Sequence, residues 1–178
     1  MEKYQNKYRI PSARLQTWDY GSNAPCFVPI CTHDRECFFG NIVETPNLGV
    51  SNTLSPIGQL AQKYWSEIPN HFPFVKLGAF VVMPNHVHGI IIIDNPANTP
   101  NLGDISVQTP KLGVCTKLGT IINQYKRAVT IGARHINPIF AWQSRFHDHI
   151  IRDDRSFQNI SNYIIRNPLN WKGDKFCN

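Results

Sequence analysis

The length, composition and charge of the chain exclude several classes of protein. Its 178 residues are enough for one compact domain, and 42% hydrophobic with 17% charged residues excludes a disordered or fibrous chain. The apolar stretches at 80–83 and 89–93 are too short to span a membrane, and residues 1–7 lack the apolar core of a signal peptide. We therefore expect one domain over residues 1–178, in the cytoplasm and without a membrane partner.

The positive charge of the chain is concentrated in its last third. The formal net charge is +6, with 7 Lys and Arg against 8 Asp and Glu in residues 1–110, and 11 against 4 in residues 111–178. A one-sided basic surface indicates a polyanionic partner, and nucleic acid is the first candidate. A solvated basic face without a partner is the alternative.

The cysteines indicate neither a disulfide framework nor a usual zinc site. Their number is odd and no CxxC pair occurs. One local group of four residues could form a zinc site, but the spacing of these residues is wrong for structural zinc. We therefore expect reduced thiols. That group is Cys26, Cys31, His33 and Cys37.

The first half of the chain predicts a strand and then a helix. Residues 26–32 read as a strand in which Pro29 indicates an edge position or a bulge. Ser55 and Pro56 form a cap and a first helical position, and apolar residues follow at helical spacing as far as Ile68. We expect this helix to end at Pro69.

The second half predicts three further strands and two helices. Residues 74–83 and 86–94 read as adjacent strands joined by a tight turn, followed by a helix over 116–134 and a strand over 145–152. A last helix begins near Asp153 or Asp154 and ends before Pro168. This order predicts an α+β fold, a ferredoxin-like sandwich with helices on one face of an antiparallel sheet.

A short repeat interrupts these elements. The pattern TPxLG occurs at 45–49, 99–103 and 109–113, within segments rich in Pro and Gly. The copies are too short and too unevenly spaced for a solenoid. We interpret them as loop insertions near 44–54 and 95–115, and a binding role for them stays open.

Two histidines begin the second of the adjacent strands. His86 and His88 alternate with Val87, so both imidazoles project from one face of the strand. Such a pair can hold a divalent metal with an open coordination position. The alternative is a pair of half-buried histidines that only make hydrogen bonds.

A tyrosine and an asparagine share one face of the last helix. Tyr163 and Asn167 stand one turn apart, at the margin of the apolar stripe formed by Phe157, Ile160 and Ile164. The tyrosine hydroxyl can emerge into a cleft, and the asparagine can offer an oxygen to a metal. In the alternative, Tyr163 only packs against its neighbours and Asn167 is a polar residue at the end of the helix.

A second histidine pair lies in the predicted strand before that helix. His147 and His149 share one face and Asp148 points to the other, which allows a further metal pair or a phosphate contact. A structural role explains these residues equally well.

Together these motifs resemble the IS200-like single-tyrosine transposases of the HUH type, and most closely the branch associated with repetitive extragenic palindromes. The resemblance rests on MPNHVHG at 83–89, WQ at 142–143 with FHDHIIR at 146–152, and NYIIRNP at 162–168. CTHDRECFFG at 31–40 also resembles that branch. It covers roughly residues 9–40 and 74–172.

The resemblance implies a metal-dependent enzyme that nicks and rejoins single-stranded DNA near hairpins in a bacterial cytoplasm. It implies that His86 and His88 hold Mg²⁺ or Mn²⁺ together with Asn167. Tyr163 would be the nucleophile that forms a 5′-phosphotyrosine, in DNA transposition or in mobilisation of palindromic repeats. Relatives act as monomers or as homodimers, and nothing in the sequence decides between them.

Charge alone suggests the residues that contact the DNA backbone. They are Lys126, Arg127, Arg152, Arg155 and Arg166. Two other functions remain open on the sequence: a non-catalytic binder of nucleic-acid hairpins, and a metal phosphodiesterase in which His86, His88 and His147 activate water.

Overall fold

The centre of the molecule is a four-stranded antiparallel sheet with the strand order β6-β7-β3-β8. The structure is a computed structural model that describes residues 3–4, 7–8, 24–45, 49–94 and 118–173. The strands of the sheet are β3 (Ala24–Cys31), β6 (Val75–Met83), β7 (His86–Ile93) and β8 (His149–Ile150). In chain order the sheet strands are therefore arranged 2-3-1-4, the order of a ferredoxin-like sandwich, which confirms the predicted fold class.

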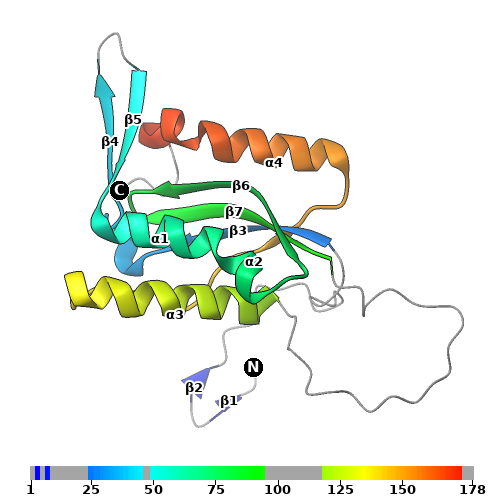
Figure 1. Cartoon of the computed structure of the whole chain (residues 1–178), viewed down its shortest axis with the longest axis horizontal. Coiled ribbons are helices and arrows are strands. Elements are labelled where there is room, and N and C mark those ends of the chain that lie inside the picture. Colours follow the sequence, from blue (N-terminus) through cyan, green and yellow to red (C-terminus); the bar gives the residue numbers. More distant parts are fainter. Residues whose placement is uncertain (1–2, 5–6, 9–23, 46–48, 95–117, 174–178) are drawn as a thin grey trace, which may run out of the picture.

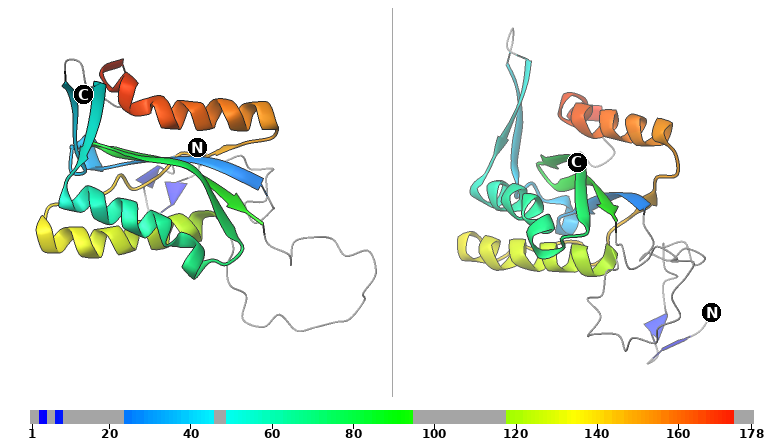
Figure 2. Two further views of the ribbon diagram at one scale, coloured as in Figure 1. Left: turned by 45° about the horizontal axis from the view of Figure 1, so that its top comes forward. Right: turned by 45° about the vertical axis from the view of Figure 1, so that its right-hand side comes forward.

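Helices cover both faces of this sheet. Helices α1 (Pro56–Ser66) and α3 (Leu118–Ile136) pack against each other, and α4 (Asp154–Arg166) packs against β6 and β7. Figures 1 and 2 show the sheet between α4 on one side and α1 with α3 on the other. The expectation that helices cover one face holds for α1 and α3, whereas α4 adds a layer on the opposite face.

The burial of β7 explains why a second helical layer is needed. Ile91 and Ile93 belong to the main core with α1 and α3, whereas Ile90 belongs to a second cluster with Ile164 of α4. A strand that is apolar on both faces must be covered on both faces. The continuous apolar run of this strand therefore requires α4.

The main helices begin where capping residues predict them. Ser55 Oγ accepts a hydrogen bond from the Gly58 amide at 3.1 Å, and Asp153 caps α4 through the Ser156 amide at 2.8 Å. After α1 the chain forms a short second helix, α2 (Ile68–His71), because Pro69 has no N–H to continue the first. Helix α3 extends to Ile136, two residues beyond the predicted end.

Strand β8 is shorter than the predicted strand over 145–152. It pairs with β3 only at Cys26 and Phe27. The carbonyl oxygens of Pro25 and Cys31 both accept hydrogen bonds on the β8 side, so Pro29 faces the same side. Pro29 has no N–H to donate, and the β3–β8 ladder ends before it, so the predicted edge position or bulge is a locally unpaired stretch of an inner strand.

A projecting hairpin was not predicted. Strands β4 (Gly40–Thr45) and β5 (Gly49–Leu54) form an antiparallel pair over part of the segment expected to be a loop insertion. Figure 1 shows this hairpin standing beyond the sheet near the end of α4. The insertion expected at 95–115 lies outside the described residues.

The remaining described elements are small. Strands β1 (Lys3–Tyr4) and β2 (Lys7–Tyr8) pair with each other, η1 (His33–Arg35) follows β3, and η3 (Asn167–Gly173) follows α4. Within the described part of the chain, no helix is both long enough and apolar enough to cross a membrane.

Candidate active site

Two buried histidines lie at the start of β7 on the face covered by α4. Val87 between them points into the main core, so His86 and His88 point to the opposite face. Their ring centroids are 4.3 Å apart, and both residues are 0% exposed. The structure thus confirms the predicted shared face and places the pair deeper than the half-buried alternative.

The neighbouring Asn85 orients the ring of His86. Its side-chain oxygen lies 2.8 Å from Nδ1 of His86, and its side-chain nitrogen donates to the Arg35 carbonyl oxygen at 3.0 Å. Because an amide oxygen only accepts, Nδ1 carries the proton, and Nε2 of His86 keeps its lone pair.

His86 also stays neutral. Burial, and secondarily the charge of Arg35, lowers the pKa of His86 to about 3. A neutral imidazole with a basic Nε2 is the form that binds a metal ion.

Tyr163 of α4 lies beside His88. Their ring centroids are 5.5 Å apart, and the ring of Phe27 stands edge-on to both, at 5.3 Å from His88 and 6.2 Å from Tyr163. Tyr163 is 42% exposed, so its ring connects the buried histidines with solvent. A large substrate can therefore reach the tyrosine.

The segment that follows α4 continues along the histidine pair. Trp171 of η3 lies against His86, with ring centroids 6.0 Å apart. Asn167 stands between Tyr163 and Trp171 in the chain, one helical turn from Tyr163, and is 1% exposed. Along this segment Tyr163 therefore lies beside His88 and Trp171 lies beside His86, with Asn167 between them in the chain.

The donor set fits a divalent cation whose remaining ligands come from the substrate. Two imidazoles and an amide oxygen suit Mn²⁺ or Mg²⁺, although fully oxygen-based sets are more usual for Mg²⁺. Among the described residues no group of three or more His, Cys, Asp or Glu could hold a metal. A cation held by His86, His88 and Asn167 would therefore depend on the substrate for its negatively charged ligands.

The zinc site considered from the cysteines is not formed. Cys26 lies in the main core, where burial and the nearby Asp148 raise its pKa to about 12. Cys31 is also buried, Cys37 is exposed, and all three are reduced. The pleat of β3 separates these side chains, and they form no metal cluster with His33.

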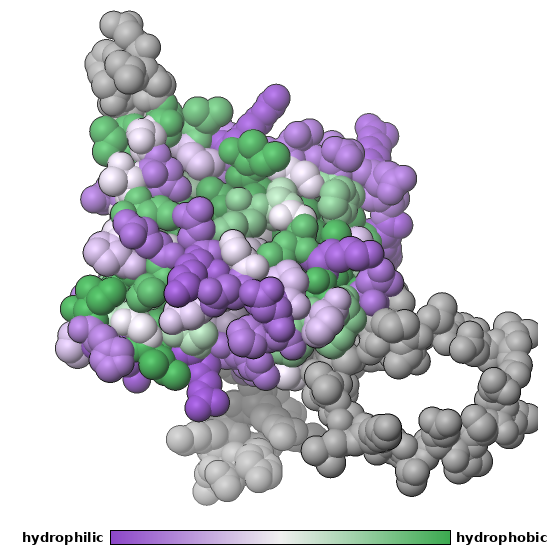
Figure 3. All heavy atoms as spheres, in the orientation of Figure 1, coloured by the Kyte–Doolittle hydropathy of each residue, from purple (hydrophilic) through white to green (hydrophobic). Residues whose placement is uncertain are grey.

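The five basic residues suggested by charge divide between the two faces of the sheet. Arg155 and Arg166 are exposed residues of α4, the helix that carries Tyr163, and exposed Arg152 precedes the helix. Figure 3 shows hydrophilic and hydrophobic side chains interspersed over the face of the molecule that is seen in Figure 1.

Lys126 and Arg127 lie on α3, across the sheet from Tyr163. The Lys126 ammonium donates to the Gln143 carbonyl oxygen at 2.6 Å, and burial lowers its pKa. Arg127 lines a cavity of about 430 Å³ between α1, α2 and α3. The structure does not bring these two residues together with Tyr163.

The second histidine pair lies at the edge of the site. His149 pairs with Phe27, and its neighbour Ile150 points into the main core, so His149 points to the face that carries Tyr163. His147 and His149 are both exposed. Strand β8 begins at His149, so the predicted alignment of His147 and His149 on one strand is not present.

Sequence reasoning missed four residues around the site. Asn85, Phe27 and Trp171 contact the histidines or the tyrosine, and the charge of Arg35 reaches His86. Asn85 and Arg35 lie within motifs that carry the family resemblance, which was the available signal. The positions of Phe27 and Trp171 depend on strand pairing and on the turn after α4.

Comparison with known proteins gives relatives in sequence and in fold. The chain is 37% identical over 168 residues to an uncharacterized protein of Haemophilus influenzae, covering 92% of this chain and 91% of that protein. A second Haemophilus influenzae protein, named "Putative REP-associated tyrosine transposase", is 28% identical over 99 residues, which are 56% of this chain and 52% of that protein. No known family model matches the chain.

Among solved structures, the fold is similar to a REP-associated tyrosine transposase bound to a REP hairpin. The TM-score is 0.51 at 18% sequence identity, covering 98% of this chain and 77% of that one. The resemblance read from the sequence motifs is thus found again in the fold.

Proposed function

This chain belongs to one family with the uncharacterized Haemophilus influenzae protein and resembles the REP-associated tyrosine transposases, and from that premise we propose that it nicks and rejoins single-stranded DNA. The observation that carries the proposal is the position of Tyr163. Its exposed ring lies beside the buried His88, whose ring centroid is 4.3 Å from that of His86. A nucleophile next to candidate metal ligands is the arrangement that phosphoryl transfer needs.

His86, His88 and Asn167 would hold Mg²⁺ or Mn²⁺. When bound, such a cation withdraws charge from a phosphate oxygen and makes the phosphorus more electrophilic. Asn85 holds the His86 ring in the required tautomer through the 2.8 Å contact with Nδ1. Burial of both histidines keeps competing water away from them.

Tyr163 would carry out the covalent step. Its phenolic oxygen loses a proton and bonds to the phosphorus, while the bond from phosphorus to the 3′ oxygen breaks. The products are a 5′-phosphotyrosine and a free 3′-hydroxyl, which takes up a proton. Because the new bond is again a phosphodiester, the 3′-hydroxyl of another strand can reverse the step and join DNA without a nucleotide cofactor.

The proposed substrate is single-stranded DNA with a hairpin, in transposition or in mobilisation of palindromic repeats. The solved neighbour is bound to a REP hairpin, and α4, which carries Tyr163, also carries the exposed Arg155 and Arg166. Phosphates on either side of the cleaved bond would contact these arginines.

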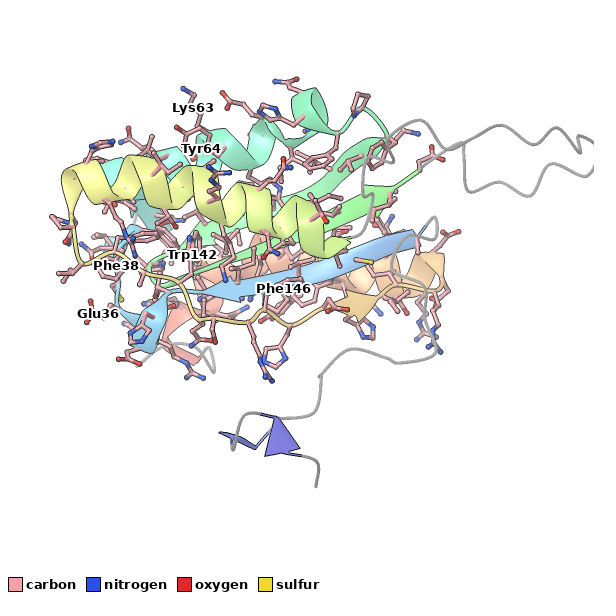
Figure 4. All side chains as sticks on the ribbon, turned by 90° about the horizontal axis from the view of Figure 1, so that it is seen from below. Glu36, Phe38, Lys63, Tyr64, Trp142 and Phe146 are labelled. Atoms are coloured by element: carbon pink, nitrogen blue, oxygen red, sulfur yellow. The ribbon has the colours of Figure 1, made fainter. Side chains whose placement is uncertain are left out.

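Cleavage by a tyrosine variant tests the proposal. Single-stranded oligonucleotides that carry hairpins from the DNA bordering the gene are incubated with Mn²⁺, and the products are separated on a denaturing gel. We expect Tyr163→Phe to abolish cleavage and Tyr64→Phe to leave it unchanged, because Tyr64 lies on α1 across the sheet (Figure 4).

The other two functions are separate outcomes of the same experiment. Hairpin binding by the wild type without any cleavage would favour a binding module. Cleavage that survives Tyr163→Phe would favour water as the nucleophile and would contradict the proposal.

A further inference from the structure

The side chain of Tyr163 is less firmly held by burial than its backbone. The backbone is fixed because the next residue, Ile164, is 0% exposed and packs in one cluster with Ile90 of β7. The Tyr163 side chain is 42% exposed, so burial leaves more than one rotamer open to it. Contacts made by the tyrosine ring therefore decide where the phenolic oxygen lies.

Phe27 of β3 contacts both the tyrosine and one of the candidate metal ligands. Its ring lies edge-on to Tyr163, with centroids 6.2 Å apart and planes at 86°, and edge-on to His88, at 5.3 Å and 67°. The rings of Tyr163 and His88 are 5.5 Å apart and inclined by 34°. Each of the three rings thus contacts the other two, and edge-to-face contacts at these distances are favourable.

The sheet holds Phe27 in a fixed position. Phe27 lies on an inner strand, in register with Ile90 of β7 on one side and with His149 of β8 on the other. The same register pairs Pro29 with His88, so His88 is the diagonal neighbour of Phe27. Aromatic side chains can bridge this diagonal distance. Phe27 and His88 therefore form one surface of the sheet, on which the tyrosine ring rests.

This arrangement lets Phe27 fix the position of the tyrosine without taking part in the chemistry. A phenyl ring has no proton to exchange and no lone pair for a metal ion. Helix α4 lies over the sheet in Figures 1 and 2, so the Phe27 ring fills space between the strand and the helix. Its removal would leave a gap into which the ring of Tyr163 could turn, away from His88.

We propose that Phe27 is a positioning residue that holds the ring of Tyr163 beside His88 for the attack on the DNA phosphate. This inference rests on the proposed function for the reaction, whereas the contacts that carry it are those of the free protein. One aromatic pair of this kind changes the population of the held conformer about two- to tenfold. The rate of the covalent step should fall by the same factor when the contact is lost, because only the held conformer reacts.

The first test compares two Phe→Leu variants of the full-length protein. Phe27→Leu removes the ring contact with Tyr163. Phe157→Leu is the matched control, because Phe157 packs against the same cluster but lies nearer the start of α4, over Gly78 of β6. Single-turnover cleavage of a hairpin oligonucleotide is measured with Mn²⁺ at saturating protein, and the Kd for the same oligonucleotide is measured in EDTA.

We expect Phe27→Leu to cleave about two- to tenfold more slowly than Phe157→Leu, with the same Kd for DNA. A residue that only stabilises the fold would change both variants alike. Equal rates in the two variants, or a loss in Phe27→Leu that appears in the Kd and not in the rate, would overturn the inference.

The second test observes the tyrosine ring without metal or DNA. Protein labelled with ¹³C in its tyrosine rings is examined by NMR in EDTA, and the signal of Tyr163 is the one lost in Tyr163→Phe. Because an aromatic ring that lies edge-on shifts the resonances of its neighbour, Phe27→Leu should move the Tyr163 signal and Phe157→Leu should leave it in place. An unchanged Tyr163 signal in Phe27→Leu would contradict the positioning role.

A measurement on the wild type applies if Phe27→Leu does not fold. A nuclear Overhauser effect between the ring protons of Phe27 and Tyr163 is expected, and its absence would overturn the inference. Cleavage that survives Tyr163→Phe would refute the proposed function, whereas the NMR results would still show whether Phe27 holds the tyrosine ring.

Discussion

Lowering the pH from 7 to 5 should destabilise the folded chain through His86. The folded state holds this imidazole buried and neutral, and burial together with Arg35 lowers its pKa to about 3. In the unfolded chain a histidine has its ordinary pKa of about 6.5. At pH 5 the unfolded state therefore binds a proton that the folded state does not.

The size and sign of the effect follow from these two values. For a base whose pKa is lowered on folding, the stabilisation is complete above the unfolded pKa and is lost as the pH falls toward the folded pKa. One pH unit in this window is worth about 1.4 kcal/mol. Since pH 5 lies about 1.5 units below the unfolded pKa, the loss between pH 7 and pH 5 is about 2 kcal/mol.

Urea unfolding in EDTA at the two pH values measures this loss. The wild type and His135→Gln, an exposed histidine on α3, should each lose stability between pH 7 and pH 5. His86→Gln should lose about 2 kcal/mol less than they do. The same pH dependence in His86→Gln and in the wild type would refute the neutral, buried His86 on which the candidate metal site depends.

Two further changes test the packing of the site strand and the face that meets DNA. A Cβ at Gly89 would overlap the ring of Trp65, whereas one at Gly173 would meet nothing within 4 Å. We therefore expect Gly89→Ala to cost about 1–3 kcal/mol in urea unfolding and Gly173→Ala to cost almost nothing. Arg166→Gln should weaken hairpin DNA binding more than Arg127→Gln, because Arg166 lies on the same helix as Tyr163 and Arg127 lies on the other side of the sheet. Equal losses in a binding titration would contradict DNA binding on the α4 side of the sheet.

Local patterns in the sequence were sufficient to predict the elements that carry the site. The alternation in 86–88 predicts that both imidazoles share a face, because the period of a strand is fixed. The cap at Asp153 and the apolar stripe of the last helix place Tyr163 at its margin, and the structure has this arrangement. The order of strands and helices likewise predicts the ferredoxin-like sheet.

Contacts between distant segments were not predictable in this way. The left-handed pair Asp34 and Arg35 contains no glycine, so no local signal marked the turn. Asn85 reads as a turn residue, and its two contacts depend on how β3 and β7 pair. The sequence predicted helices on one face of the sheet only. The structure shows that α4 covers the other face, because the apolar run of β7 is buried on both sides.

The measurement that most directly tests the account is a covalent bond between DNA and Tyr163. Single-stranded hairpin oligonucleotides labelled at the 3′ end are incubated with the protein and Mn²⁺, and the mixture is separated on a denaturing protein gel. We predict a labelled protein band that is lost with chelator and in Tyr163→Phe, retained in Tyr64→Phe, and mapped to Tyr163 by mass spectrometry. Cleaved DNA without any labelled protein would contradict the account.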